Sequence, residues 1–316
     1  MLQTEVLIVG GGPAGSACAW QLKQHNVDFL LLDKVAFPRP KTCAGWITPR
    51  VLRDLQLDPA SYPGSFTTFR NFKIEFKRLR FSIPTRQYAI RRIELDDWLI
   101  RRVSEKVVTH NVVDIVEESG RYIVDGEYSA RYLIGAGGTH CPVKRIFFHS
   151  DDPSASGILI IAEEEEFVYP HVSENCHLWY FQNGLPGYAW YFPKANGLIN
   201  VGIGGDSAAL KAHHDNLNRH WNLLVEKLDK AGLVHGHEFK PAGHSYSLRA
   251  KSPVLRVGNA LLVGDALGMA TMDMGEGIGP SVQSGINAAK AIISGTPYTL
   301  AGIARYSIPA LLGLRR

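Results

Sequence analysis

The 316-residue sequence has little of what marks a membrane, secreted or metal-binding protein. No apolar run approaches the roughly 18 residues that cross a bilayer, so we expect no transmembrane helix. A glycine-rich turn that begins at residue 10 leaves no room for the apolar core of a secretory signal. The 4 cysteines are scattered without CxxC spacing, which favours a reducing compartment and no structural zinc. These absences predict a cytoplasmic protein.

The net charge is also small, at a formal +4. We therefore expect no nucleic-acid partner, although this charge suits an anionic cofactor or peripheral contact with a membrane. The histidines between residues 213 and 237 have no carboxylate or cysteine at ligand spacing, so we expect surface histidines and no metal. The acidic run from Glu163 to Glu166 is interpreted as a solvated edge.

The most specific pattern lies between Thr4 and Lys34. An apolar run, Val6 to Val9, leads into the glycine-rich turn Gly10-Gly11-Gly12-Pro13-Ala14-Gly15. A helix-compatible segment follows, and a second apolar run, Phe29 to Leu32, ends on Asp33. Strand, glycine turn, helix, strand and acidic residue together predict a dinucleotide-binding unit.

Each residue type in this unit has a physical reason. Gly10 permits the tight turn, Gly12 lets a diphosphate approach the backbone where a Cβ would interfere, and Gly15 allows close helix packing. The N-terminus of the helix offers free N–H groups and the positive end of its dipole to the diphosphate. The Asp33 carboxylate can accept hydrogen bonds from both ribose hydroxyls of an adenosine.

A second block of the sequence, Arg256 to Ser294, supplies another place for an extended cofactor. A short strand over 260–263 leads to Asp265, and a helix with one apolar face is predicted to begin near Gly277. Asp265 can bind a ribityl or phosphate-linked hydroxyl, while the helix N-terminus at Gly277 and Ile278 can stabilise a reduced isoalloxazine. The two blocks together favour FAD over NAD.

The rest of the chain predicts a mixed architecture. Short helices are expected near Pro49 and over 91–100, and a longer one over 208–231. Alternating segments between residues 66 and 90 and between 150 and 250 predict an antiparallel sheet. We predict an α/β (mixed α+β) fold with a Rossmann-type FAD-binding domain and an inserted antiparallel-sheet substrate domain. The cofactor domain is assigned to residues 1–65, 87–149 and 250–316, and the substrate domain to residues 66–86 and 150–249.

These motifs resemble the FAD-dependent geranylgeranyl reductase family, within the p-hydroxybenzoate hydroxylase-like flavoprotein fold. The strand GYAWYFPK over 187–194 is similar to a YxWxFP strand of these reductases, although flavin-dependent halogenases carry a related stretch. The other matching stretches are GGGPAG with Asp33, the loop KTCAG over 41–45, Arg92-x-x-Leu95-Asp96, the strand end GAGG over 135–138, Gly264-Asp265, and GEGI over 275–278.

The resemblance implies a set of site residues. Tyr188 and Trp190 would shape a substrate pocket beside the flavin, and Cys43 would lie near the ring, in either a functional or a merely small buried contact. These three form the candidate catalytic set. The implied cofactor-binding residues are Gly10, Gly12, Ala14 and Gly15 at the diphosphate, Asp33 with Lys34 at the adenosine ribose, Cys43, Ala44 and Trp46 along the loop, Arg92 at the diphosphate or ribityl chain, Val112 near the adenine, Asp265 at the ribityl-diphosphate region, and Gly277 and Ile278 at the isoalloxazine edge.

The resemblance implies an oxidoreductase that passes hydride from reduced flavin to a carbon–carbon double bond of a prenyl or other apolar substrate. NADPH, NADH or a redox partner would supply the electrons, and Tyr188, Cys43 or water the proton. A flavin-dependent monooxygenase or halogenase and a non-catalytic flavin-binding redox protein are the alternatives. The sequence departs from the wider pattern at Gly137, where an aspartate is usual. Only 21 residues follow Gly295, where prenyl reductases generally continue.

Overall fold

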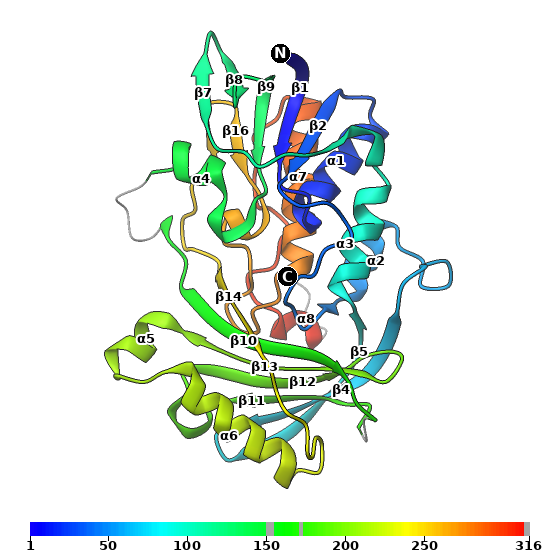
Figure 1. Ribbon diagram of the computed structural model, residues 1–316, viewed down its shortest axis with the longest axis vertical. Helices are drawn as coiled ribbons and strands as arrows, with labels where there is room; N and C mark the ends of the chain where they lie inside the picture. The colour runs from blue at the N-terminus through cyan, green and yellow to red at the C-terminus, as the bar shows by residue number, and fades with distance from the viewer. Residues whose placement is uncertain (150–154, 171–172, 313–316) are drawn as a thin grey trace.

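The structure, a computed structural model, describes residues 1–149, 155–170 and 173–312 and contains two β-sheets with helices packed against them (Figure 1). Sheet A, in the upper half of Figure 1, consists of β1 (Leu2–Val9), β2 (Phe29–Asp33), β6 (Val107–Thr109), β7 (Ile115–Glu118), β8 (Arg121–Val124), β9 (Tyr128–Gly135), β15 (Arg256–Val257) and β16 (Ala260–Leu262). Sheet B, in the lower half, consists of β3 (Trp46–Ile47), β4 (Phe66–Phe76), β5 (Leu79–Ile90), β10 (Leu159–Val168), β11 (Cys176–Tyr180), β12 (Gly187–Pro193), β13 (Leu198–Asp206) and β14 (Ala242–Ser247).

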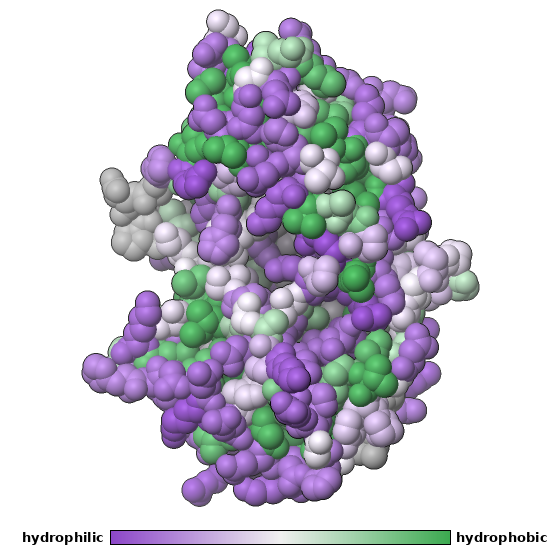
Figure 2. Space-filling model, in the orientation of Figure 1, coloured by the Kyte–Doolittle hydropathy of each residue, from purple (hydrophilic) through white to green (hydrophobic). Residues whose placement is uncertain are grey.

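The helices join and cover these sheets. They are α1 (Pro13–Gln24), α2 (Pro49–Leu55), α3 (Arg92–Arg101), α4 (Pro142–Phe147), α5 (Ser207–Ala212), α6 (Leu217–Lys230), α7 (Ile278–Ser294) and α8 (Ile308–Leu311), with 3-10 turns η1 (Ser104–Lys106), η2 (Gly138–His140), η4 (Gln182–Gly184) and η5 (Gly264–Ala266). Figure 2 shows that the surface is hollowed between the halves that hold the two sheets. The predicted mixed fold with a Rossmann-type unit and a second sheet is confirmed.

Sheet A has the strand order β15-β16-β9-β1-β2-β6, with the β7–β8 hairpin attached to β9. β16, β9, β1, β2 and β6 run parallel, and every residue of β2 is buried. Such continuous burial is typical of parallel strands that are covered on both faces. Helices α1 and α7 cover one face, while α4 and the β7–β8 hairpin cover the other.

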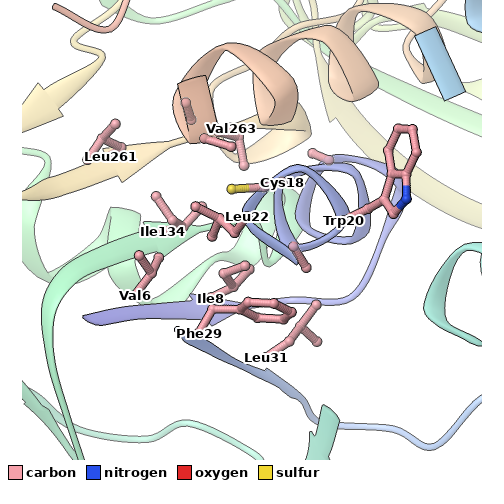
Figure 3. Close-up of a cluster of buried hydrophobic side chains, with 14 of the residues drawn as sticks. Val6, Ile8, Cys18, Trp20, Leu22, Phe29, Leu31, Ile134, Leu261 and Val263 are labelled. Carbon is pink, nitrogen blue, oxygen red and sulfur yellow. The ribbon is translucent and has the colours of Figure 1, made fainter. Parts of the chain in front are cut away.

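Figure 3 shows the core that joins α1 to sheet A. Apolar side chains from β1, β2, β9 and β16 point toward Cys18 and Leu22 of α1. Cys18 is fully buried, and this burial raises the pKa of its thiol to about 12, so the group behaves as a small apolar side chain. The core side chains of the sheet in this view are Val6, Ile8, Phe29, Leu31, Ile134 and Leu261.

The packing of α7 on α1 depends on glycine residues, which have no Cβ. A Cβ on Gly285 of α7 would lie 2.1 Å from the carbonyl oxygen of Ala14, closer than van der Waals contact allows. A Cβ on Gly15 would lie 1.9 Å from the carbonyl oxygen of Gly10. The predicted close packing at Gly15 is therefore confirmed, and α7 lies directly on α1 of the N-terminal Rossmann-type unit.

Sheet B has the order β14-β10-β13-β12-β11-β4-β5-β3 and is antiparallel except where β4 joins β11. Its lower face is covered by α5, which buries Leu210 against it, and by α6, which buries Leu217, Trp221 and Leu224. The predicted single helix over 208–231 is wrong, since α5 ends at Ala212 and α6 starts at Leu217. His214 has a φ of 50° between them, and the side chain of Asn216 caps α6.

One further prediction about polar residues is wrong, and another fails at a single residue. The acidic run lies on β10, inside sheet B between β14 and β13, so Glu164 is only 2% exposed and Glu166 is half-buried. Of the histidines predicted at the surface, His213, His214 and His235 are exposed, whereas His220 of α6 is buried, with its Nε2 2.7 Å from the Oδ2 of Asp215. A run of charges and a lone histidine do not reveal which neighbouring elements will cover them.

The division into domains stays a prediction. Residues 46–47 and 87–90 pair inside sheet B, although they fall in the segments assigned to the cofactor domain. Among the described residues, no group of three or more potential ligands could hold a metal, and no helix is long and apolar enough to cross a membrane.

Gly285→Ala should lower the free energy of unfolding by about 2 kcal/mol, because the new methyl group would force α7 away from α1. The measurement is chemical denaturation of the FAD-free protein followed by circular dichroism. Gly243→Ala is the matched control, since a Cβ there is 3.9 Å from its nearest neighbour, and it should stay within about 0.5 kcal/mol of the starting protein. Equal losses in both variants would contradict the packing role of Gly285.

Candidate cofactor and substrate site

A cleft of about 880 Å³ lies at the carboxyl ends of β1, β2 and β9. This edge of a parallel sheet is where ligands bind in doubly wound folds. The cleft brings together segments that are far apart in the sequence. Its lining includes Gly10, Gly12, Ala14, Asp33, Lys34, Arg92, Val112, Ala136 and Asp265.

The glycine turn forms the floor of this cleft. Gly10 has a φ of 112°, and a Cβ there would lie 2.4 Å from the carbonyl oxygen of Ala136. Gly12 is different, because a Cβ there would meet no atom within 4 Å and would project into the open cleft. The missing side chain of Gly12 thus leaves space for a ligand at the N-terminus of α1.

Asp33 is held rigidly at the end of β2. Its Oδ2 accepts a hydrogen bond of 2.7 Å from the backbone N–H of Gly11, and its Oδ1 accepts one of 3.0 Å from Val35. Arg39 approaches to 3.7 Å through Nη2. A carboxylate has about four acceptor positions, so Asp33 retains capacity for ribose hydroxyls. Lys34, next in the chain, is exposed at the rim.

Two buried nitrogens in the cleft wall have no partner among the described residues. They are Nε of Arg39 and Nδ1 of His244. An unpaired buried polar atom costs about 1–3 kcal/mol, which a ligand with acceptor atoms would recover at Arg39. Burial, with the charges of Lys41 and Arg92, lowers the pKa of His244 to about 4, so this imidazole is neutral. The open space at Gly12 and the unpaired Arg39 fit a diphosphate, and the cleft therefore fits FAD.

A smaller cavity of about 130 Å³ adjoins the cleft and shares Lys41, Arg92, His244 and Asp265 with it. It collects the predicted residues of the flavin half and of the substrate pocket. These are Cys43, Ala44, Trp46, Tyr188, Trp190, Gly277 and Ile278.

A buried ion pair fixes the polar side of this cavity. The Nε and Nη2 atoms of Arg92 donate to the two carboxylate oxygens of Asp96, at 2.9 and 3.0 Å. Burial alone would lower the pKa of Arg92, but the Asp96 carboxylate and Cys43 raise it, so the guanidinium stays charged. Asp265 also lines this cavity, and burial raises the pKa of its carboxyl group.

The aromatic walls are held by hydrogen bonds at their polar ends. The Tyr188 hydroxyl donates to the carbonyl oxygen of Met274 at 2.5 Å, and burial raises its pKa well above the usual range. The indole Nε1 of Trp190 donates to Asn200 at 2.7 Å, and that of Trp46 donates to Gln87 at 3.0 Å. Because these groups are satisfied, the rings present apolar surface to the cavity.

The N-terminus of α7 closes the cavity at Gly277 and Ile278. Glu276 accepts a hydrogen bond of 2.6 Å from the backbone N–H of Gly279, and burial raises its pKa to about 7. At the far end of the cleft, the buried Val112 lies with His110 and Asn111 in the segment after β6.

Sequence reasoning missed several groups that the structure brings into the site. Arg39 and Lys41 were visible only as basic residues of a loop. Glu164, His244 and Tyr246 gave no local signal, because they reach the cavity through the alternation of β10 and β14. Their position in the cavity wall could have been predicted only from the pairing register of β10 and β14.

Comparison with known proteins identifies the family of this chain. A sequence model of the NAD(P)-binding Rossmann-like domain matches residues 8–58. An uncharacterized protein of Methanosarcina barkeri is 30% identical over 311 residues, which cover 93% of this chain and 76% of that protein. Menaquinone reductase of Mycolicibacterium smegmatis is 29% identical (93% and 77%), and geranylgeranyl diphosphate reductase of Rhodobacter capsulatus is 24% identical (93% and 76%).

Solved structures share the fold. A geranylgeranyl bacteriochlorophyll reductase-like protein from Thermoplasma acidophilum superposes with a TM-score of 0.78 at 20% identity, covering 95% of this chain and 82% of that one. The flavin-dependent halogenase CmlS has a TM-score of 0.69 at 20% identity, covering 94% and 59%. The relatives and the motifs agree, and the chain belongs to the FAD-dependent geranylgeranyl reductase family.

Proposed function

We propose that this flavoenzyme reduces a carbon–carbon double bond in the isoprenoid chain of a lipid-like substrate. The observation that carries the proposal is the aromatic cavity beside the cofactor cleft, whose walls include Tyr188, Trp190 and Phe192. The relatives named for menaquinone and for geranylgeranyl diphosphate support this substrate class, because both molecules carry isoprenoid chains. A cytoplasmic enzyme reduced by NADPH or NADH accords with the sequence.

Different protein groups bind different parts of the cofactor. Bound FAD, once reduced, supplies the hydride. The α1 N-terminus and Gly12 bind the diphosphate, Asp33 binds the adenosine ribose, and Arg92 and Asp265 orient the middle of the cofactor. The α7 N-terminus at Ile278 places the positive end of a helix dipole where negative charge develops on reduction.

The substrate side of the cavity is assigned to Cys43 and the aromatic strand β12. The Cys43 Sγ accepts a hydrogen bond of 3.4 Å from the backbone N–H of Gly45, which holds the thiol toward the cavity lining. Tyr188 and Trp190 exclude water from the double bond, and this exclusion strengthens every electrostatic interaction within the site.

A Gly12→Val change should weaken FAD binding by at least about ten-fold, because the side chain would fill the space assigned to the diphosphate. The measurement is titration of FAD-free protein with FAD, followed by flavin fluorescence. Gly243→Val is the control outside the cleft and should bind FAD as the starting protein does. Unchanged affinity in Gly12→Val would remove the diphosphate assignment.

Turnover can be tested without knowing the electron donor. Dithionite-reduced protein should be reoxidised in the absence of oxygen by geranylgeranyl diphosphate or menaquinone, and mass spectrometry should detect the saturated product. A hydroxylated or chlorinated product formed only with oxygen would instead indicate a monooxygenase or halogenase. Failure of NADPH and NADH to reduce the flavin, together with no reoxidation by either lipid, would indicate a redox protein without this activity.

Peripheral membrane contact is part of the proposal and is assigned to the turn between β4 and β5. Residues 70–86 contain six basic residues and one acidic residue, whereas the whole chain has a net charge of only +4. Large apolar side chains are exposed beside these charges, a combination that favours an anionic lipid surface. They are Phe76 (40% exposed), Leu79 (69%), Phe81 (49%) and, on the adjacent turn, Phe181 (43%).

Aromatic contacts lead from this surface to the cavity. Phe76 contacts Phe181 with ring centroids 5.4 Å apart, and Phe181 lies 6.2 Å from Tyr180. Tyr180 in turn stacks on Tyr188 of the cavity wall at 4.8 Å. An apolar chain that leaves the membrane at this turn would thus meet apolar side chains as far as the cavity.

Replacing both Lys77 and Arg78 by alanine should weaken binding to anionic phospholipid vesicles about thirty-fold, at about 1 kcal/mol for each basic residue. Cosedimentation at low and high salt measures this loss. Val168→Ser, which changes an exposed apolar residue at the end of β10, should leave vesicle binding unchanged. Equal binding of the double variant and the starting protein would exclude this turn as the contact.

A further inference from the structure

Glu164 is a buried carboxyl group in the wall of the substrate cavity. Its residue exposure is 2%, and it lines the cavity with Cys43, Tyr188 and Trp190. Successive side chains of a strand point to opposite faces, so Glu164 points into the cavity and Glu163 points toward the α6 side. Packing agrees, since Ala162 belongs to the apolar cluster on the cavity side and Phe167 to the cluster under α6.

Two neighbouring polar groups already have partners. The Tyr188 hydroxyl donates to Met274, and Lys194 donates to Glu166 at 2.6 Å. Among the described residues, no hydrogen bond contributes to the ionisation of Glu164; burial and distant charges alone determine it. A buried carboxyl without a structural partner is costly in the folded protein, and such groups concentrate where chemistry needs them.

We propose that Glu164 is the general acid of the reduction and donates a proton to the double-bond carbon next to the one that accepts the hydride. This inference rests on the proposed reductase function and adds a catalytic residue to it. The π bond of the substrate breaks as one carbon gains hydride from reduced flavin and the other gains the Glu164 proton. The electron pair passes from flavin to substrate, and the resulting Glu164 carboxylate takes a new proton from solvent through the cleft.

The charges around Glu164 leave it with a suitable acidity. Burial raises its pKa to about 7, against the opposing effects of Lys194, Lys41 and Arg92 and with a small contribution from Glu166. Lys194 is the strongest of these opposing charges, and it pairs with Glu166, which also accepts a hydrogen bond of 2.7 Å from Arg91. A general acid works best with a pKa near the operating pH. The titratable groups that line the cavity with Glu164 are Lys41, Cys43, Arg92, Tyr188, His244, Tyr246, Asp265 and Glu276, and the charges of Lys194 and Glu166 also act on it.

Tyr188 and Cys43 are weaker candidates for the same role. The high pKa of the Tyr188 hydroxyl and its bond to a backbone carbonyl oppose proton release. The Cys43 Sγ serves as an acceptor for Gly45 and lies beside the charged Arg92. Glu164 alone of the three combines a free carboxyl, a position in the cavity wall and an acidity near neutral pH.

The test compares Glu164→Gln with Glu163→Gln, its neighbour on the opposite face of the strand. Reduced, FAD-loaded protein is mixed anaerobically with geranylgeranyl diphosphate or menaquinone at a series of pH values. In the starting protein the reoxidation rate should fall as the pH rises through about 7, because Glu164 loses its proton. Glu164→Gln should be at least about 100-fold slower and lose this pH dependence, while Glu163→Gln retains both rate and profile.

An infrared titration of FAD-loaded protein without substrate gives an independent readout. Glu164 and Glu276 should each give a carboxylic acid band that disappears as the pH rises through about 7. In Glu164→Gln one of these bands should be absent, while the band from Glu276 is still lost over the same pH range. No such difference between the two proteins would overturn the assignment, even if neither lipid proves to be a substrate. A Glu164→Gln variant that reoxidises at the starting rate would overturn it as well.

If Glu164→Gln binds no FAD, Glu164→Asp decides the question. This variant keeps a carboxylic acid one methylene further from the cavity. It should retain a rate that is below that of the starting protein and that still falls as the pH rises. A Glu164→Asp rate that does not change with pH would contradict the proposal.

Discussion

The contact between α1 and α7 is the constraint on which the site depends. Neither helix alone forms the proposed cofactor site, because α1 follows the turn assigned to the diphosphate and α7 carries the end assigned to the flavin. Gly285 lies so close to the backbone of Ala14 that no side chain would fit between them. This contact joins residues 271 positions apart in the sequence, and Asp265 and Gly12 line the same cleft. The cleft and the cavity form one continuous site for that reason.

The two sheets then divide the chemistry. Sheet A presents backbone N–H groups, glycines and a fixed carboxylate, which suit a charged and hydroxylated ligand. Sheet B presents aromatic rings whose polar atoms already have partners, which suit an apolar ligand. Arg92, Lys41 and His244 border both spaces, so the boundary between polar and apolar binding falls near the predicted position of the flavin. Hydride transfer requires both ligands to meet at this boundary.

Local sequence patterns predicted most of the fold correctly. They gave wrong predictions where residues distant in the sequence determine the local structure or burial. The glycine turn, the strands over 66–90 and the helix after Gly277 follow from spacing within a few residues, so the sequence alone predicted them. The break before Leu217 depends on one left-handed residue and one cap, which apolar periodicity does not detect. The burial of Glu164 depends on β14 and β13, which are paired with β10 only in the folded sheet. The gathering of Cys43, Tyr188 and Trp190 came from the family resemblance.

The acidic run on β10 also bears on how this strand finds its register. With four glutamates in succession, a slip of one residue would still present two carboxylates to each face of the sheet. The charges therefore cannot select the correct pairing, and the flanking apolar residues must do so. Phe167 has to reach the cluster under α6, and Ala162 has to face the cavity. Apolar side chains, some of which lie outside the site, thus determine which glutamate points into the cavity.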